Sequence, residues 1–336
     1  MNPDGTFLGD MSYNQDRHGP QVGTVLGQLY GPNAQELGAT LGTPATTSII
    51  SGTVIGQLAS GSTPGPTANL ALTNMITVEQ FQANQVVLGE DIATAPGAAQ
   101  HVTSFSLNPQ GSATYFTSTG AAESFIAAEE VAGASPNFTV YRTAAGDEEL
   151  DLYKPGTANS ELQLTYAGFG EWRRDNPSAP GQPDREFFTY GILTPYATMA
   201  NRFGTAQYTG VVHGAGEVLG ASTRYDLQGS VNYTMDFTSE TYTGSLAIKG
   251  FDTVTSAERD FDPISIPAVS ILAANQSPNS PAAGAVNAFQ NGAVVGQITN
   301  RFFGLAGDEI AGVFNFTVPG GPGPTNLVGV AAAKRN

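Results

Sequence analysis

Short runs rich in threonine, valine, tyrosine and phenylalanine recur along most of the chain, separated by glycine, proline, asparagine or aspartate. β-Branched and aromatic residues favour strands, and the separating residues are those that form turns. In the second half of the chain the turn signals recur about every 8 to 12 residues, which is typical of an antiparallel sandwich or barrel. The sequence therefore predicts an all-β protein.

These runs make eight or nine strands after residue 160. They cover residues 161–169, 187–192, 206–212, 223–229, 232–237, 241–248, 294–303, 310–318 and 327–333. In the first run, Leu162, Leu164 and Tyr166 fall on one face, because side chains alternate along a strand. Small closed barrels filled by their own side chains usually have about eight strands, and closure removes exposed strand edges. We therefore expect an eight-stranded antiparallel β-barrel over residues 158–336.

A smaller and less regular β-rich domain is predicted before the barrel, over residues 61–157, with the turn Pro155-Gly156 at its end. Strands are expected at residues 101–107, 114–119, 138–142 and 149–153. Two windows, residues 74–88 and 121–131, have helical spacing of apolar residues or many Ala and Glu residues, and predict short helices. Residues 59–72 and 92–100 indicate loops or linkers.

Residues 1–60 form a third segment, which contains an internal repeat. Gly23–Leu29 recurs almost unchanged as Gly52–Leu58. A looser repeat matches residues 22–31 with residues 295–304, and it extends to a Glu-Leu or Glu-Ile pair at 36–37 and 309–310. Two interpretations stay open: convergent hairpin chemistry, or a copy of a barrel's closing hairpin. An isolated hairpin is not stable, so the second interpretation requires the segment to pack on a barrel or to exchange with one.

Composition excludes several classes of protein. The chain has 13 Lys and Arg residues against 29 Asp and Glu residues, a formal net charge of −16, so we expect no nucleic-acid partner. No apolar run reaches the roughly 20 residues of a membrane helix, and no signal peptide is predicted at the N-terminus. The chain contains no cysteine, which excludes disulfides, thiol nucleophiles and cysteine-ligated metals.

Catalytic and metal-binding patterns are sparse. The three histidines, His18, His101 and His213, do not have the spacing of a known metal motif. Acidic clusters lie at 129–130 and 147–149, but their members are contiguous, so on a strand they point to alternate faces; we interpret them as solvated turns. The sequence has no Gly-x-Ser-x-Gly elbow and no phosphate-binding loop. We therefore expect a protein that is not an enzyme and has no metal site.

An ordered series of motifs resembles a known family. The series runs LTYAGFGEW at 164–172, FTYG at 188–191, AQYTGVVHG at 206–214, YDLQGSV at 225–231, MDF at 235–237, GLAGDEIAGVF at 304–314 and GVAAAKR at 329–335. In this order the motifs resemble the β-barrel domain of transferrin-binding protein B-like surface proteins. Residues 110–160 resemble, more weakly, the small handle sheet of that family, and residues 30–39 are similar to its final hairpin.

This resemblance implies an eight-stranded barrel with a flanking handle-like domain, in a surface-exposed or secreted protein of a Gram-negative bacterium. Members of the family capture host iron proteins or haem. The lipid-anchoring cysteine of many members has no counterpart here, because the chain contains no cysteine.

Two places are candidate binding sites. His213 lies in a Val-Val-His-Gly sequence at the predicted end of a strand, where it is either a turn-edge imidazole or an axial haem ligand, with Tyr208 and Tyr225 as candidate second ligands. Trp172, the only tryptophan, either plugs a barrel end or forms a partner-binding hot spot with Arg173 and Arg174. Recognition loops are expected at residues 173–185, 196–205, 252–263 and 275–291.

These observations favour a non-enzymatic binding protein at the cell surface or outside the cell, which captures a protein or a haem- or iron-related ligand through barrel loops. An alternative is a structural subunit of a surface layer, filament or virion. In that alternative, copies assemble through strand contacts of residues 20–42, as a homo-oligomer. A third hypothesis is a hydrolase that uses carboxylates.

Overall fold

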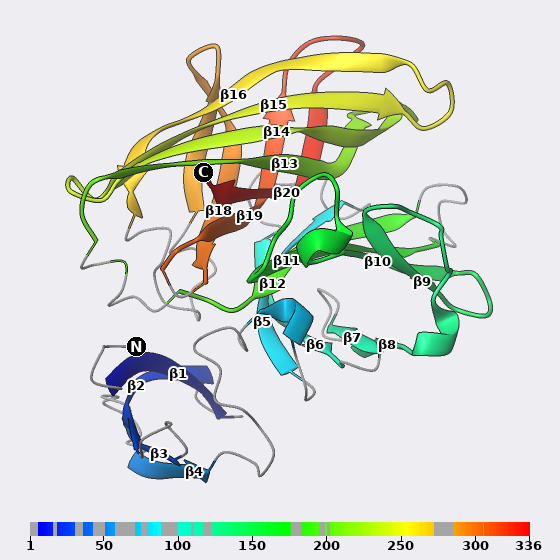
Figure 1. Ribbon diagram of the computed structural model, residues 1–336. Coiled ribbons are helices and arrows are strands. Elements are labelled where there is room, and N and C mark those ends of the chain that lie inside the picture. Colours follow the sequence, from blue (N-terminus) through cyan, green and yellow to red (C-terminus); the bar gives the residue numbers. More distant parts are fainter. Residues whose placement is uncertain are drawn as a thin grey trace.

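The computed structural model describes fourteen segments of the chain. They are residues 6–15, 19–30, 36–42, 51–57, 71–74, 79–88, 100–108, 111–116, 122–175, 183–194, 199, 202–271, 285–304 and 306–336. Almost all of these residues lie in strands or in the turns between them, as the sequence predicts (Figure 1). Among them, no helix is long and apolar enough to cross a membrane.

The strands form three antiparallel sheets (Figure 1). A four-stranded sheet has the order β1 (Thr6–Gln15), β2 (Gly19–Tyr30), β3 (Glu36–Gly42) and β4 (Ser51–Gln57). An eight-stranded sheet, here called the handle sheet, has the order β8-β7-β6-β5-β12-β11-β10-β9. Its strands are β5 (Glu79–Leu88), β6 (Gln100–Leu107), β7 (Ala113–Phe116), β8 (Ala122–Phe125), β9 (Phe138–Arg142), β10 (Glu148–Tyr153), β11 (Ala167–Arg174) and β12 (Asp184–Gly191).

The third sheet is a closed barrel in which each strand pairs with its neighbours in sequence and β13 pairs with β20. Its strands are β13 (Thr205–Val218), β14 (Arg224–Asp236), β15 (Thr241–Asp252), β16 (Glu258–Ser270), β17 (Ala285–Gln290), β18 (Ala293–Phe303), β19 (Glu309–Val318) and β20 (Thr325–Arg335). The prediction of a C-terminal eight-stranded antiparallel barrel is therefore confirmed.

Side chains from the barrel strands fill the barrel. Alternate residues point inward, and the largest of them are tyrosines and phenylalanines that are almost fully buried. The interior also holds Asn300, which accepts a hydrogen bond from the Tyr233 hydroxyl (3.1 Å) and donates one to the Tyr242 hydroxyl (3.3 Å). These hydrogen bonds satisfy the polar groups that close packing removes from water.

The outer wall of the barrel at β19 and β20 packs against the handle sheet. Phe169 and Phe187 of the handle sheet share one buried cluster with Val313 and Val330 of the barrel. Residues of β19 and β20 are therefore buried on both faces, one toward the barrel interior and one toward the handle sheet. The opposite face of the handle sheet has an aromatic core of its own, which includes Trp172.

A buried carboxylate joins the barrel to the start of β11. Glu309, the first residue of β19, accepts hydrogen bonds from the backbone N–H groups of Thr165 (2.6 Å), Tyr166 (2.8 Å) and Ala167 (2.8 Å). Its side chain is fully buried, and this desolvation raises the pKa of the carboxyl group, while the three N–H donors act in the opposite direction. The contact holds the chain at the entrance of β11 against the barrel wall.

The predicted barrel boundary at residue 158 was wrong. Residues 167–174 and 184–191 are β11 and β12, which pair with β10 and β5 in the handle sheet, and the barrel begins at Thr205. The two predicted strands 223–229 and 232–237 are one strand, β14. Two barrel strands were missed: the predicted loop 252–263 covers the first part of β16, a strand that contains Pro263 and Pro267, and the predicted loop 275–291 contains β17.

The helix prediction for residues 74–88 was also wrong, since Glu79–Leu88 is strand β5. Phe81 packs in the aromatic core and Val86 packs against the barrel, so β5 has apolar residues on both faces. Its sequence therefore lacks the alternation of polar and apolar residues that marks a strand with one buried face. In the window 121–131 the only helix is the single 3-10 turn Ala127–Glu129, after strand β8. Residues 1–60 contain a four-stranded sheet rather than one hairpin, and its packing on or exchange with a barrel stays a prediction.

We expect Glu309→Gln to lower the free energy of unfolding by about 1–3 kcal/mol, because the amide nitrogen replaces an acceptor that faces buried N–H donors. Denaturant unfolding of both proteins measures this change. Glu258→Gln is the matched control: Glu258 lies on the exposed barrel surface beside Lys249, and its loss is expected to cost no more than about 0.5 kcal/mol. Equal stability of the two variants would contradict the role assigned to Glu309.

Candidate functional site

A cavity of about 210 Å³ lies between the handle sheet and the outside of the barrel. The handle sheet contributes residues of β9 to β12, and the barrel contributes residues of β13, β14 and β20. One side of the cavity is aromatic, with Phe138, Phe169 and Phe187, and the other side carries charged residues.

The strand register explains this division. Side chains directly opposite each other on neighbouring strands share a face. On the barrel-facing side of the handle sheet, Arg142, Glu149, Arg173 and Arg185 follow one another across β9 to β12. The next row carries Val140, Asp151, Glu171 and Phe187, and the row beyond it carries Phe138, Tyr153 and Phe169. The sheet face therefore changes from charged to aromatic along the strands.

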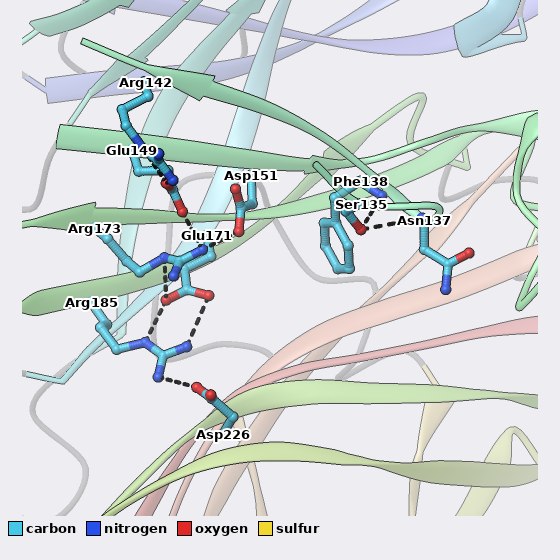
Figure 2. A network of polar contacts seen from close by, with 10 residues as sticks. All are labelled: Ser135, Asn137, Phe138, Arg142, Glu149, Asp151, Glu171, Arg173, Arg185 and Asp226. Atoms are coloured by element: carbon cyan, nitrogen blue, oxygen red, sulfur yellow. Dashed lines mark hydrogen bonds and ion pairs between the residues drawn. The ribbon is translucent and has the colours of Figure 1, made fainter. Parts of the chain in front are cut away.

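The charged rows form one continuous network, shown in Figure 2. Glu149 accepts a hydrogen bond from Arg142 Nε (2.8 Å) and pairs with Arg173 Nη2 (2.6 Å). Arg173 also pairs with Asp151 and, through Nε, with Glu171 (3.4 Å between Nε and Oε1).

Arg185 connects this network to the barrel. Its guanidinium group binds both carboxylate oxygens of Glu171, with 3.0 Å between Nη2 and Oε2, and its Nη1 donates to Asp226 Oδ1 of β14 at 2.7 Å (Figure 2). Arg185 is nearly buried, and the pKa of its side chain is raised because the attraction of Glu171 and Asp226 outweighs the cost of desolvation. The bidentate pair with Glu171 fixes the orientation of the guanidinium group on the handle sheet, and the single bond to Asp226 joins this group to β14.

Among the carboxylates of the network, Asp151 is the one whose loss of hydration on burial is least offset by its charged partners. Burial raises the pKa of its carboxyl group from 3.8 to about 6, against the opposing effect of Arg173. Its Oδ1 atom is buried and has no hydrogen-bond partner in the described part of the chain. Asp151 is therefore a group of the cavity whose charge changes under mildly acidic conditions.

His213 was predicted at a strand end, but it lies within β13, opposite Gln228 of β14 and Val330 of β20. Its ring lies against Phe138, Tyr153 and Phe169, with ring centroids 5.3 to 5.9 Å apart. Its Nε2 atom lies 3.1 Å from Glu161 Oε2, and this contact lowers the pKa of the Glu161 carboxyl group.

The haem-ligand arrangement predicted from the sequence is not formed. Tyr208 and Tyr225 point into the barrel interior, whereas His213 points outward to the handle sheet. The three side chains therefore cannot meet on one ligand. Of the other two histidines, His18 lies outside the described residues and His101 is in β6.

Trp172, Arg173 and Arg174 do not form one surface. Trp172 is buried in the aromatic core of the handle sheet, beside Tyr115 at 5.9 Å between ring centroids, so it neither plugs a barrel end nor reaches a partner. Arg174 lies over the indole ring on that same face, with 5.3 Å between its guanidinium carbon and the ring centroid. Arg173 belongs to the charged network on the opposite face, because neighbours on a strand alternate.

The sequence missed most of the network. Asp151, Glu171, Arg185 and Asp226 were not singled out, although the first three lie on neighbouring strands that carry opposite charges. The acidic cluster 147–149 was interpreted as a solvated turn. Asp147 fits that interpretation and accepts a hydrogen bond from the Thr143 hydroxyl (2.8 Å), whereas Glu149 belongs to the network.

Three turns lie together at the barrel end where β13 finishes. They are residues 219–223, 253–257 and 319–324, which follow β13, β15 and β19. Thr253 N–H donates to Arg224 O (3.0 Å) and Leu219 N–H donates to Pro324 O (2.8 Å), so the turns are adjacent. The turn at 253–257 is further held by Asp252 Oδ1, which accepts hydrogen bonds from the N–H groups of Val254 (2.9 Å) and Thr255 (2.7 Å).

Apolar side chains are displayed on these turns. Val254 is 88% exposed and Leu219 is 40% exposed. Among the four predicted recognition loops, only this part of 252–263 is a described turn. Much of 173–185 and 196–205 lies outside the described residues, as does 272–284, and residues 285–290 are strand β17.

We expect the stability of Asp151→Asn, relative to the unsubstituted protein, to increase between pH 4 and pH 7. The folded carboxyl group binds its proton up to a pH of about 6, but the unfolded one only up to about 3.8, so rising pH weakens the unsubstituted protein over this interval. The expected gain of the variant is up to about 3 kcal/mol, read from thermal or denaturant unfolding at several pH values.

Asp252→Asn is the control for this measurement, and its stability relative to the unsubstituted protein is expected to stay nearly constant between pH 4 and pH 7. The N–H groups of Thr255 and Val254 lower the pKa of Asp252 from 3.8, so its contribution to stability is present throughout this interval and is lost only at lower pH. A pH-independent difference for Asp151→Asn would show that its carboxyl group is not perturbed by burial.

Proteins similar to this chain are found among solved structures. No protein-family model matches the chain, and no curated protein matches it. Solved structures of transferrin-binding protein B are similar to it. The double-mutant vaccine antigen from Haemophilus parasuis is 13% identical, with a TM-score of 0.40, and the match covers 99% of this chain and 59% of that chain.

The isotype 1 protein from serogroup B Neisseria meningitidis is 14% identical, with a TM-score of 0.40, and the match covers 94% of this chain and 52% of that chain. The chain thus spans between half and three fifths of the length of these structures.

Proposed function

We propose that this protein is a non-enzymatic binding protein, exposed at a bacterial cell surface or secreted, which captures a protein partner through the three turns at one end of the barrel. The observation that carries the proposal is the pair of exposed apolar side chains, Val254 and Leu219, on neighbouring turns. The sequence motifs that resemble transferrin-binding protein B-like proteins support the same class of function.

The hydrogen bonds within the turns favour binding. Asp252 holds the backbone of the turn that carries Val254, and the backbone contacts to Arg224 and Pro324 join this turn to its neighbours. A surface that is already ordered loses little conformational entropy when it binds, so more of the contact energy appears as affinity. Recognition residues on a rigid barrel are commonly placed on such turns.

The chemistry of the chain favours a protein, rather than a small molecule, as the ligand. The interior of the barrel is filled by its own side chains, and in the described cavity beside it the arginines are engaged by carboxylates. The net charge of −16 favours a partner whose contact surface carries a basic rim, because opposite charges accelerate association. Haem binding stays a prediction, and a haem titration followed in the Soret region tests it.

We expect Val254→Asp to weaken partner binding by tenfold or more, which corresponds to about 1.4 kcal/mol, because a charge replaces an apolar contact. The probes are iron-loaded transferrin, iron-free transferrin and haemoglobin, each passed over the immobilised chain. Phe203→Asp is the matched control, since Phe203 is 83% exposed just before β13, at the opposite barrel end.

If both substitutions weaken partner binding equally, the three turns are not the binding surface. Failure of the unsubstituted chain to bind any of the three probes would count against capture of an iron protein.

A further inference from the structure

The N-terminal hairpin β2–β3 has the same strand register as the barrel hairpin β18–β19. The sequence repeat aligns Tyr30 with Phe303 and Glu36 with Glu309. Tyr30 pairs with Glu36 in the first hairpin, and Phe303 pairs with Glu309 in the second. All seven pairs of β2–β3, from Thr24–Gly42 to Tyr30–Glu36, have their aligned counterparts paired in β18–β19. A slip of a single residue would have removed this correspondence.

The shared register also identifies the faces of the N-terminal sheet. Val25, Leu37 and Leu41 align with Ile298, Ile310 and Phe314, which point into the barrel and are completely buried. Cross-strand neighbours extend this face of the N-terminal sheet onto β1 and β4. Its members whose side chains the structure describes, here called the inner face, are all apolar or glycine: Phe7, Gly9, Met11, Gly23, Val25, Gly27, Leu37, Ala39, Leu41, Gly52, Val54 and Gly56.

The inner face is incompletely covered in the described part of the chain. Phe7, Met11, Val25, Leu37 and Leu41 are only half-buried, and Val54 is 39% exposed, whereas the aligned barrel residues are fully buried. The ring of Phe7 lies over Gly27 and leaves no room there for a Cβ atom. The opposite face is more exposed and carries the polar residues Asp10, Thr24 and Thr40 together with Leu8 and Leu26.

The N-terminal sheet thus has the composition of half a barrel. In the described residues it ends at two edge strands, β1 and β4, with no further pairing. The barrel of the same chain cannot extend it, because β13 to β20 close on themselves and leave no edge. Four more antiparallel strands with an apolar inner face would be needed to cover it.

We propose that the β1–β4 sheets of two copies of this chain close into an intermolecular eight-stranded barrel. Because the four strands alternate in direction, β1 and β4 are antiparallel to each other. When the two copies are related by a two-fold axis that runs along the new barrel, β4 of each copy meets β1 of the other in antiparallel orientation. These two contacts between copies are the seams of the barrel. Such a closed, symmetric contact covers both inner faces and leaves no free edge.

This proposal is independent of the binding function assigned to the barrel turns. It places the assembly contact on the sheet that contains residues 20–42, and it limits the assembly to two copies, since the barrel is closed after eight strands.

Sedimentation and light scattering of the full chain measure the mass, which is 34.8 kDa for one copy. We expect twice this mass for the unsubstituted chain and for Leu26→Asp, and the single-copy mass for Val25→Asp. Val25 is on the inner face, and its neighbour Leu26 is 59% exposed on the opposite face, so the two substitutions introduce the same charge on the two sides of β2. Fluorescence of Trp172, buried in the handle sheet, shows whether each variant keeps the rest of its fold.

Hydrogen exchange of the unsubstituted chain gives a second measurement that needs no variant. In the dimer, the backbone N–H groups of β1 and β4 are paired at both seams, so we expect them to exchange slowly and to lose this protection on dilution. A single-copy mass for the unsubstituted chain would overturn the proposal. So would a dimer that Val25→Asp leaves intact, or an open polymer in place of a closed pair.

Discussion

The packing of one barrel wall on both of its faces is the constraint on which this structure depends. Residues of β19 and β20 fill the barrel on one side and meet Phe169 and Phe187 of the handle sheet on the other. Glu309 stands at the start of this wall and binds three backbone N–H groups at the entrance of β11. Since a buried N–H group without an acceptor is costly, the sheet cannot shift along the barrel without breaking these contacts.

The charged network beside the cavity follows from the same contact. Packing of Phe138, Tyr153 and Phe169 around His213 closes the aromatic end of the interface, and the strand alternation then places the charged rows at its other end. Arg185 and Asp226 join the two sheets there. Buried ion pairs of this kind contribute orientation more than net stability, because each charge loses its hydration.

Much of the fold could be predicted from the sequence, and the errors concern strands with apolar residues on both faces or with proline. Barrel strands such as β13 and β15 were recognised as threonine-, valine- and tyrosine-rich runs between turn signals, whereas β5, which has apolar residues on both faces, was predicted as a helix. β11 and β12 were assigned to the barrel and β14 was counted as two strands, whereas β16, with its two prolines, and β17 were missed. The predicted total of eight or nine strands is close to the observed eight because these errors largely compensated.

By itself, the sequence determined that the chain is built of antiparallel strands and that an eight-stranded barrel occupies its second half. These properties are local, since strand-forming runs and turn residues are set within a few residues of each other. The similarity of residues 22–37 to residues 295–310 was visible in the sequence, but the shared strand register of the two hairpins was not. Only the tertiary structure decided where the handle sheet ends, that Trp172 is buried, that His213 faces Glu161, and that Arg173 and Arg185 join one network. These contacts connect residues far apart in sequence, and which of them form depends on how the sheets pack, which no local pattern encodes.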